Sequence, residues 1–116
     1  MDANILIREV ESFAEIDPEM QLATMLTFLY IARRGVCIQQ DIERELGMSN
    51  ASASRNVSYW TQFKAYNKPG KGFVERMEDP KDRRQRLLRL SKEGKEFFDK
   101  LTGREYGKAE GKKLAS

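Results

Sequence analysis

The chain has 116 residues, 40% of them hydrophobic, which suits one compact domain with its own core and leaves little room for a second. It contains no histidine and a single cysteine, which excludes histidine acid–base chemistry, an internal disulfide and a thiolate metal cluster, so we expect no cofactor and a reducing cytoplasmic location. The formal net charge is +3 with 34% charged residues, and neither a signal peptide nor an apolar run near the ~18 residues of a membrane span is present, so we expect a soluble protein with no membrane partner.

Residues 3–15 predict an amphipathic helix, the first element of the chain. Apolar side chains recur there at helical spacing between charged ones. Asp17 and Pro18 are residue types favoured at the N-cap and the first position of a helix, so the next helix is expected to begin at this pair. The apolar face of residues 3–15 consists of Ile5, Leu6, Val10 and Phe13.

The second helix is predicted over residues 20–32. Its sequence is apolar on nearly every face, which is typical of a central helix covered on most sides, so Leu26 is expected in the core. Arg33-Arg34-Gly35 end it with cations at the negative helix end and a glycine for a left-handed cap. Val36-Cys37-Ile38 then predicts one short strand. Cys37 has no adjacent cation in this apolar run, which favours a buried structural thiol over a redox sensor.

Two short amphipathic helices joined by a tight turn are predicted next. The first covers residues 39–46, lacks a good capping residue at its start and is stopped by Gly47. Ser49 is a favourable N-cap for the second helix, which is expected near residues 49–63. So short a glycine-containing connection between two helices is typical of the helix-turn-helix motif. The buried stripe of the second helix is formed by Ala53, Val57 and Trp60.

Beyond these helices the sequence predicts a loop and then a β-hairpin. Residues 64–72 contain enough proline and glycine to form a loop. Residues 73–77 and 87–90 are strand-like, and the polar residues 78–86 between them form the expected turn. A hairpin that follows a helix-turn-helix occupies the position of the wing in a winged helix.

Ser91 is the expected N-cap of a final helix. The residues after Gly103 are rich in Gly and Lys, so residues 103–116 are predicted to be a basic, disordered tail. The folded domain is therefore expected over residues 1–102, and its predicted class is mainly α with a small β-hairpin, a winged helix-turn-helix. The apolar side chains of the final helix are Phe97, Phe98 and Leu101.

The exposed face predicted for residues 49–63 has the chemistry of a helix that enters the DNA major groove. It carries small and hydrogen-bonding side chains with one arginine, which allow close approach and contacts to base edges. A merely solvated face is the alternative, but such faces are usually rich in Lys and Glu, and no acid occurs between Ser49 and Lys64. Trp60 lies on the buried stripe, which favours core packing over base stacking. The predicted DNA contacts of this helix are Ser49, Asn50, Ala51, Ser52, Ser54, Arg55 and Ser58.

The predicted hairpin turn is strongly basic. A slender turn with arginines can enter the minor groove, where negative potential is concentrated, although a charged turn by itself is common in soluble proteins. Residues 49–116 carry +8 (seventeen basic residues, nine acids), whereas residues 1–48 carry −5 (four basic residues, nine acids), so helix and turn share a basic half. The predicted contacts of the turn are Lys81, Asp82, Arg83, Arg84 and Arg86.

From about residue 20 to residue 101 the sequence resembles the MarR family of winged-helix transcription regulators. The resemblance is carried by Asp41-Ile42-Glu43-Arg44-Glu45-Leu46-Gly47-Met48-Ser49, by Arg55, by Asp79-Pro80-Lys81-Asp82-Arg83-Arg84, and by Leu88-Arg89-Leu90-Ser91-Lys92-Glu93-Gly94-Lys95. It implies that Asp82 orients Arg84 toward the minor groove, and that the protein is a homodimer. Family members dimerise through an N-terminal helix and long C-terminal helices, and the short C-terminal region implies a smaller or different interface here. The loop at 64–72 is longer than in the family, which implies either an unusual angle of the wing or additional phosphate contacts through Lys64, Lys68 and Lys71.

The sequence thus predicts a sequence-specific regulator of transcription that binds double-stranded DNA, with half-sites roughly 10 base pairs apart. Two alternatives remain: a winged-helix adaptor for protein–protein contact, and an accessory factor that binds DNA through phosphates without sequence preference. No paired carboxylates, phosphate-binding glycine loop or nucleophile–base constellation is present, which argues against an enzyme. No residue pattern supports a small-molecule effector.

Overall fold

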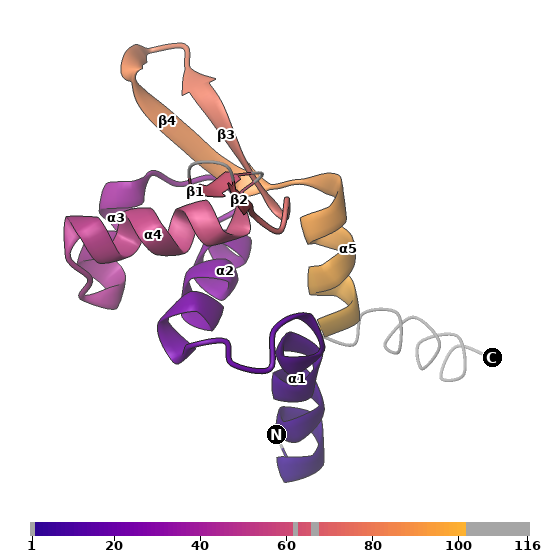
Figure 1. The fold of residues 1–116 in the computed structure, drawn as a ribbon. Coiled ribbons are helices and arrows are strands. Elements are labelled where there is room, and N and C mark those ends of the chain that lie inside the picture. The colour runs from indigo at the N-terminus through magenta and orange to yellow at the C-terminus, as the bar shows by residue number, and fades with distance from the viewer. Residues whose placement is uncertain (1, 62, 66–67, 102–116) are drawn as a thin grey trace.

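A computed structural model describes residues 2–61, 63–65 and 68–101 (Figure 1). The predicted class, mainly helical with one β-hairpin that forms a wing, is confirmed. The predicted tail, residues 103–116, and the boundary at residue 102 lie outside the described residues. In the described ranges no helix is both long and apolar enough to cross a membrane. The elements are α1 (Ala3–Ile16), α2 (Leu22–Arg34), α3 (Gln39–Leu46), α4 (Asn50–Trp60), β1 (Phe63–Ala65), β2 (Lys68–Pro69), β3 (Val74–Asp79), β4 (Asp82–Leu90) and α5 (Lys92–Leu101).

An aromatic cluster joins the helices. Phe28 on α2 and Trp60 on α4 are both fully buried, and their ring centroids are 4.9 Å apart. Phe13 on α1 and Phe97 on α5 meet edge to face at 5.5 Å and both contact Phe28. The Trp60 indole donates a hydrogen bond to the Thr24 carbonyl of α2 at 2.7 Å, so its one polar atom is satisfied inside the core. Core packing of Trp60, predicted from the helical stripe, is confirmed.

The predicted start of the second helix at Asp17 is wrong. The Asp17 N–H instead closes α1 by donating to the Phe13 carbonyl, and α2 begins five residues later, at Leu22. The Asp17 carboxylate accepts hydrogen bonds from the Glu19 N–H at 3.0 Å and from the Tyr59 hydroxyl of α4 at 2.8 Å. The Asp17 carboxylate, which the local pattern predicted to cap a helix, therefore accepts instead from a side chain of α4.

The expectation that α2 is covered on most sides is confirmed except along one strip, since its only exposed residues are Leu22, Leu26, Arg33 and Arg34. Leu22 is 69% exposed and Leu26 is 40% exposed, so the expectation that Leu26 lies in the core is wrong. α3, α4 and β4 pack against α2, whose buried residues are Thr24, Thr27, Phe28, Tyr30 and Ile31. On α1 the predicted apolar face also stays largely exposed, since only its Phe13 is buried. Ile16 is half-buried against the core, and the exposed large apolar side chains of α1, 39–54% exposed, are Ile5, Leu6, Ile7 and Val10.

The helix-turn-helix forms where it was predicted, with Ser49 as the predicted N-cap and with an earlier end. The missing capping group of α3 is supplied by Asp41, whose carboxylate accepts from the Ile38 N–H at 2.9 Å. Gly47 ends α3 in the left-handed conformation (φ 64°, ψ 36°), and the Ser49 hydroxyl caps α4 by accepting from the Ser52 N–H at 3.1 Å. The second helix stops at Trp60 rather than near residue 63, because Thr61 is extended and the chain continues into β1.

The hairpin is longer and its turn shorter than predicted. Strands β3 and β4 pair from Val74–Leu90 to Asp79–Asp82, which leaves only Pro80 and Lys81 as the turn. The Asp79 carboxylate stabilises this tight end by accepting from the Lys81 N–H at 2.9 Å and the Gln85 amide at 3.0 Å. The loop prediction for residues 64–72 is wrong in part, because β1 and β2 pair within it as an antiparallel ribbon.

Cys37 attaches the hairpin to the helical body. Its backbone forms an isolated antiparallel bridge with Leu88, with N–H···O distances of 3.0 and 2.7 Å in the two directions, so the strand predicted at 36–38 is reduced to one bridge. The side chain is buried, and burial raises the pKa of the thiol to about 11. This supports a structural role for the thiol and leaves little thiolate at neutral pH.

Candidate nucleic-acid interface

The predicted face of α4 is accessible along the first two turns of the helix. Ser49, Asn50, Ala51 and Arg55 are exposed, and the serines at 52, 54 and 58 are half-buried. On the opposite side Ala53, Val57 and Trp60 are 0–1% exposed, so the helix has a fully buried stripe and an open, small-residue face. The accessible face retains the geometry that insertion into a groove requires.

Asn56 fixes the rotation of α4 on α2, a role that the sequence did not suggest. Its amide nitrogen donates to the Ser52 carbonyl at 2.9 Å and lies 3.4 Å from the Ser52 hydroxyl. Its amide oxygen accepts from the Thr24 hydroxyl of α2 at 2.6 Å. Ser52 is therefore held by Asn56. The face that α4 presents is set by the hydrogen bond between Thr24 and Asn56, which lie 32 residues apart in sequence.

Arg76 connects the base of the hairpin to the end of α4. Its guanidinium donates to the Ser58 hydroxyl at 3.1 Å and to the Thr61 hydroxyl at 3.2 Å, and partial burial lowers the pKa of Arg76. Ser58, a predicted DNA contact, is thus engaged with the hairpin. Arg76 pairs with Leu88, which places this cation on the inner face of the hairpin. The sequence could have indicated this role only if the register of the two strands had been known.

The basic residues of the hairpin lie along β4, not in a broad turn. Arg84 and Arg86 share one face with Leu88, Arg83 lies on the other, and Lys81 is at the turn. Asp82 and Arg84 are brought together as the resemblance implied. The Asp82 carboxylate accepts from the Arg84 N–H at 3.1 Å and lies 3.4 Å from Arg84 Nε, while the Arg84 side chain is 93% exposed.

A hollow of about 340 Å³ separates the inner face of the hairpin from the start of α3. In Figure 1 the hairpin projects away from the helical body beside α3 and α4. Gln39 lines this hollow and also lies 3.5 Å from the Asn50 carbonyl, so the start of α3 lies between the hairpin and the start of α4. The polar residues that line the hollow are Gln39, Gln40, Arg76, Asp82, Arg84, Gln85 and Arg86.

Of the three lysines predicted to contact phosphates from the loop at 64–72, only Lys71 has a described side chain. The side chains of Lys64 and Lys68 lie outside the described part of the structure. Lys71 is exposed, and its ammonium lies 5.6 Å from the centre of the Tyr59 ring, in cation–π contact.

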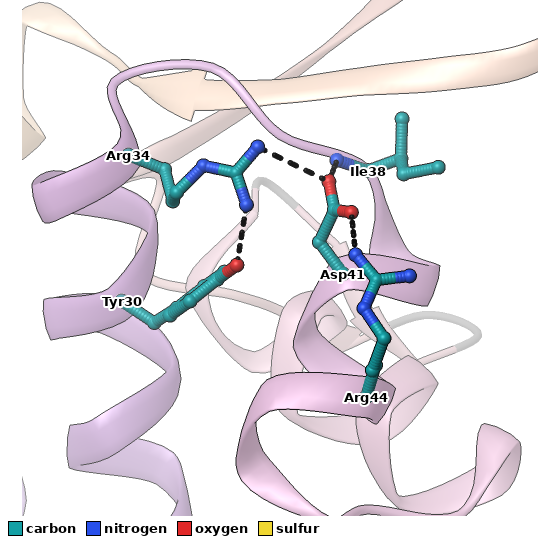
Figure 2. A network of polar contacts seen from close by, with 5 residues as sticks. All are labelled: Tyr30, Arg34, Ile38, Asp41 and Arg44. Atoms are coloured by element: carbon teal, nitrogen blue, oxygen red, sulfur yellow. Dashed lines mark hydrogen bonds and ion pairs between the residues drawn. The ribbon is translucent and has the colours of Figure 1, made fainter.

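A polar network attaches the start of α3 to the end of α2 (Figure 2). Asp41 accepts from the Ile38 N–H and, at 2.7 Å, from Arg44, and lies 3.7 Å from Arg34, whose other guanidinium nitrogen donates to the Tyr30 hydroxyl at 2.6 Å. The hydrogen bond from the Ile38 N–H, with smaller contributions from the Arg44 and Arg34 guanidinium groups, holds the pKa of Asp41 below its usual range against the opposing effect of burial. The network fixes the angle at which α3 leaves α2, and so positions the helix-turn-helix.

Helix-turn-helix, hairpin and aromatic core together define a winged-helix protein. No protein-family model and no curated protein sequence matches the chain. Among solved structures, RV1404 from Mycobacterium tuberculosis matches with TM-score 0.67 and 19% identity over 96% of this chain and 69% of that one. A mutant MarR from E. coli complexed with operator DNA matches with TM-score 0.61 and 16% identity over 84% and 65%. Streptococcus pneumoniae FabT in complex with DNA matches with TM-score 0.64 and 22% identity over 96% and 71%.

The chain therefore has the fold of the MarR-type transcription regulators. It covers 65–71% of the length of these three structures.

Proposed function

We propose that this protein is a transcription regulator that binds double-stranded DNA in a sequence-specific manner, with α4 in the major groove and the β3–β4 wing in the minor groove. The observation that carries the proposal is the open, small-residue face of α4 beside a basic wing, both fixed on one rigid body. Small and hydrogen-bonding side chains let a helix approach the floor of the major groove closely and contact base edges, and basic side chains on a slender wing fit the minor groove. Two of the similar structures contain DNA.

The proposed contacts divide into two groups. Asn50, Ser52, Ser54 and Arg55, on the first turns of α4, face base edges, and Ser49, Ala51 and Ser58 line the approach to the backbone. Arg84 enters the minor groove, held by Asp82, while Lys81, Arg83 and Arg86 contact phosphates along the wing. Each phosphate contact releases counterions, so affinity decreases as salt is raised.

We further propose that the protein acts as a homodimer in the cytoplasm. Six large apolar side chains on the outer surfaces of α1 and α2 are 39–69% exposed. Exposed apolar surface of this kind marks an interaction site, and a second copy of the chain would bury it while placing two copies of α4 on one DNA. Two-fold symmetry then requires a palindromic site with half-sites roughly 10 base pairs apart.

Selection from a random duplex library at two salt concentrations tests the proposal. We expect a palindromic DNA sequence to be enriched at both salt concentrations. Salt-sensitive binding without a motif would instead support an accessory factor that binds phosphates, and no binding at low salt would leave the adaptor function.

A further inference from the structure

A carboxylate lies where the starts of α3 and α4 meet. Glu43 Oε2 accepts a hydrogen bond from the side-chain amide of Gln39, the first residue of α3, at 3.2 Å. The same oxygen accepts from the side-chain amide of Asn50, the first residue of α4, also at 3.2 Å. Gln39 in addition lies 3.5 Å from the Asn50 carbonyl. One acidic oxygen therefore joins the two helix starts on the surface that continues into the wing.

Glu43 differs from Asp41 and Asp82, two other carboxylates near this surface, in having neutral partners. Asp41 is paired with Arg44 at 2.7 Å and Asp82 with Arg84 at 3.4 Å. Within residues 2–61, 63–65 and 68–101 no Lys or Arg forms an ion pair with Glu43. Amide groups bind a carboxylate without cancelling its charge, so the surface keeps a negative charge beside Asn50.

An uncancelled negative charge at a DNA interface favours some base pairs and disfavours all phosphates. Phosphates repel it whatever the sequence, which weakens binding to random DNA. In the major groove a carboxylate can accept only from base-edge donors, which are the N4 amino group of cytosine and the N6 amino group of adenine. Guanine and thymine present acceptors at the corresponding edge positions, and these repel it.

We propose that Glu43 is a specificity-determining residue of the DNA interface, which selects a cytosine or adenine amino group at one position of each half-site and disfavours other sequences. The inference rests on the proposed function. Glu43 acts directly through its free oxygen lone pairs, and it also holds Asn50 and Gln39 in one arrangement. Specificity then comes partly from repulsion, since the same charge that accepts from the correct base rejects the wrong ones.

Glu43→Gln is the informative variant, because glutamine has the same shape and its oxygen can still accept from both amides. It removes the charge and adds a donor, so it can also pair with guanine or thymine. Glu45→Gln is the matched control. Glu45 is exposed on the same helix, about 200° around the axis from Glu43, and the substitution makes the same change in net charge.

Both variants and the wild type are subjected to random-duplex selection, to affinity measurement on a non-specific duplex and to thermal melting. We expect the wild-type motif to contain cytosine or adenine at one position per half-site and Glu43→Gln to lose that preference alone. We also expect Glu43→Gln to bind the non-specific duplex about threefold more tightly, as removal of one charge near a phosphate predicts. Glu45→Gln keeps the full motif, and all three proteins melt cooperatively.

Two outcomes would overturn the inference, and they are distinguishable. A wild type that enriches no motif overturns the proposed function and this inference together. A wild-type motif that Glu43→Gln retains at every position overturns this inference alone and leaves Glu43 a purely structural link. Glu43→Ala gives a second check, because it removes both hydrogen bonds and must also relax the same position.

Discussion

Two regions of the molecule differ in how completely a single chain buries them. The first is the junction of α3, α4 and the wing, and the second is the outer surfaces of α1 and α2. At the junction, side chains of one element form hydrogen bonds with another element. Asn56 accepts from Thr24, Arg76 donates to Ser58, and the Trp60 indole donates to a carbonyl of α2. Among the described residues no buried side-chain nitrogen or oxygen lacks a hydrogen-bond partner. This half is rigid by itself and can hold a binding surface at a fixed angle.

The outer surfaces of α1 and α2 are left open. In Figure 1 α1 extends from the side of the body opposite the wing, and of its side chains only Phe13 is buried. Leucines as exposed as Leu6 and Leu22 gain little from folding of a single chain. The difference supports the proposed homodimer, in which a second copy covers the outer surfaces of α1 and α2.

Removing the centre of the junction should have the largest effect. Trp60→Ala deletes a fully buried ring between α2 and α4, together with its hydrogen bond to Thr24, so we expect a loss of about 3–5 kcal/mol in the free energy of unfolding. Urea denaturation followed by circular dichroism measures it. A loss below about 1 kcal/mol would show that the aromatic cluster does not hold the junction together.

Gly94→Ala should have the next largest effect. Ser91 caps α5 by accepting from the Gly94 N–H at 3.0 Å, and a Cβ at Gly94 would lie 1.9 Å from the Phe73 carbonyl oxygen. Since backbone must move to admit a methyl group, we expect about 1–3 kcal/mol of destabilisation in the same urea assay. Lys95→Ala, at the exposed neighbouring position, is the control and should change stability by less than about 0.5 kcal/mol.

Arg84→Ala should affect binding and leave folding unchanged. The side chain is 93% exposed, so the urea midpoint should not move, whereas affinity for the selected duplex should decrease roughly tenfold, as expected for one charged hydrogen-bonding contact. Arg89→Ala is the matched control, because Arg89 lies on the opposite face of β4, paired with Glu75 at 2.9 Å. Equal losses in the two variants would mean that general charge, not the inner face of the wing, accounts for binding.

Leu6→Ser on the open half should change the stability of the single chain only slightly. Leu6 is 53% exposed, so the substitution should cost the isolated chain less than about 0.5 kcal/mol. If a second copy covers this surface, the wild-type melting temperature rises with protein concentration and Leu6→Ser abolishes that dependence. Glu11→Ser, an exposed polar position on α1, should retain it. A wild-type melting temperature independent of concentration would count against the dimer.

Several features of the molecule were determined by the sequence alone, because they depend on neighbours a few residues apart. Gly47 and Ser49 mark the turn of the helix-turn-helix, since a left-handed glycine and a capping hydroxyl act locally. The stripe of Ala53, Val57 and Trp60 follows from helical periodicity. The Asp82–Arg84 pair was implied by the resemblance to the MarR family.

Other features were decided only by the tertiary structure, because they depend on which distant segments meet. Asp17 caps no helix and accepts instead from Tyr59 of α4, and Leu26 lies on the one strip of α2 that the packed elements leave exposed. The sequence between Ser49 and Lys64 contains no acid, yet folding brings Glu43 against Asn50. Local patterns specify the elements, but the polar groups that set the interface come from different elements and acquire their partners only when those elements pack together.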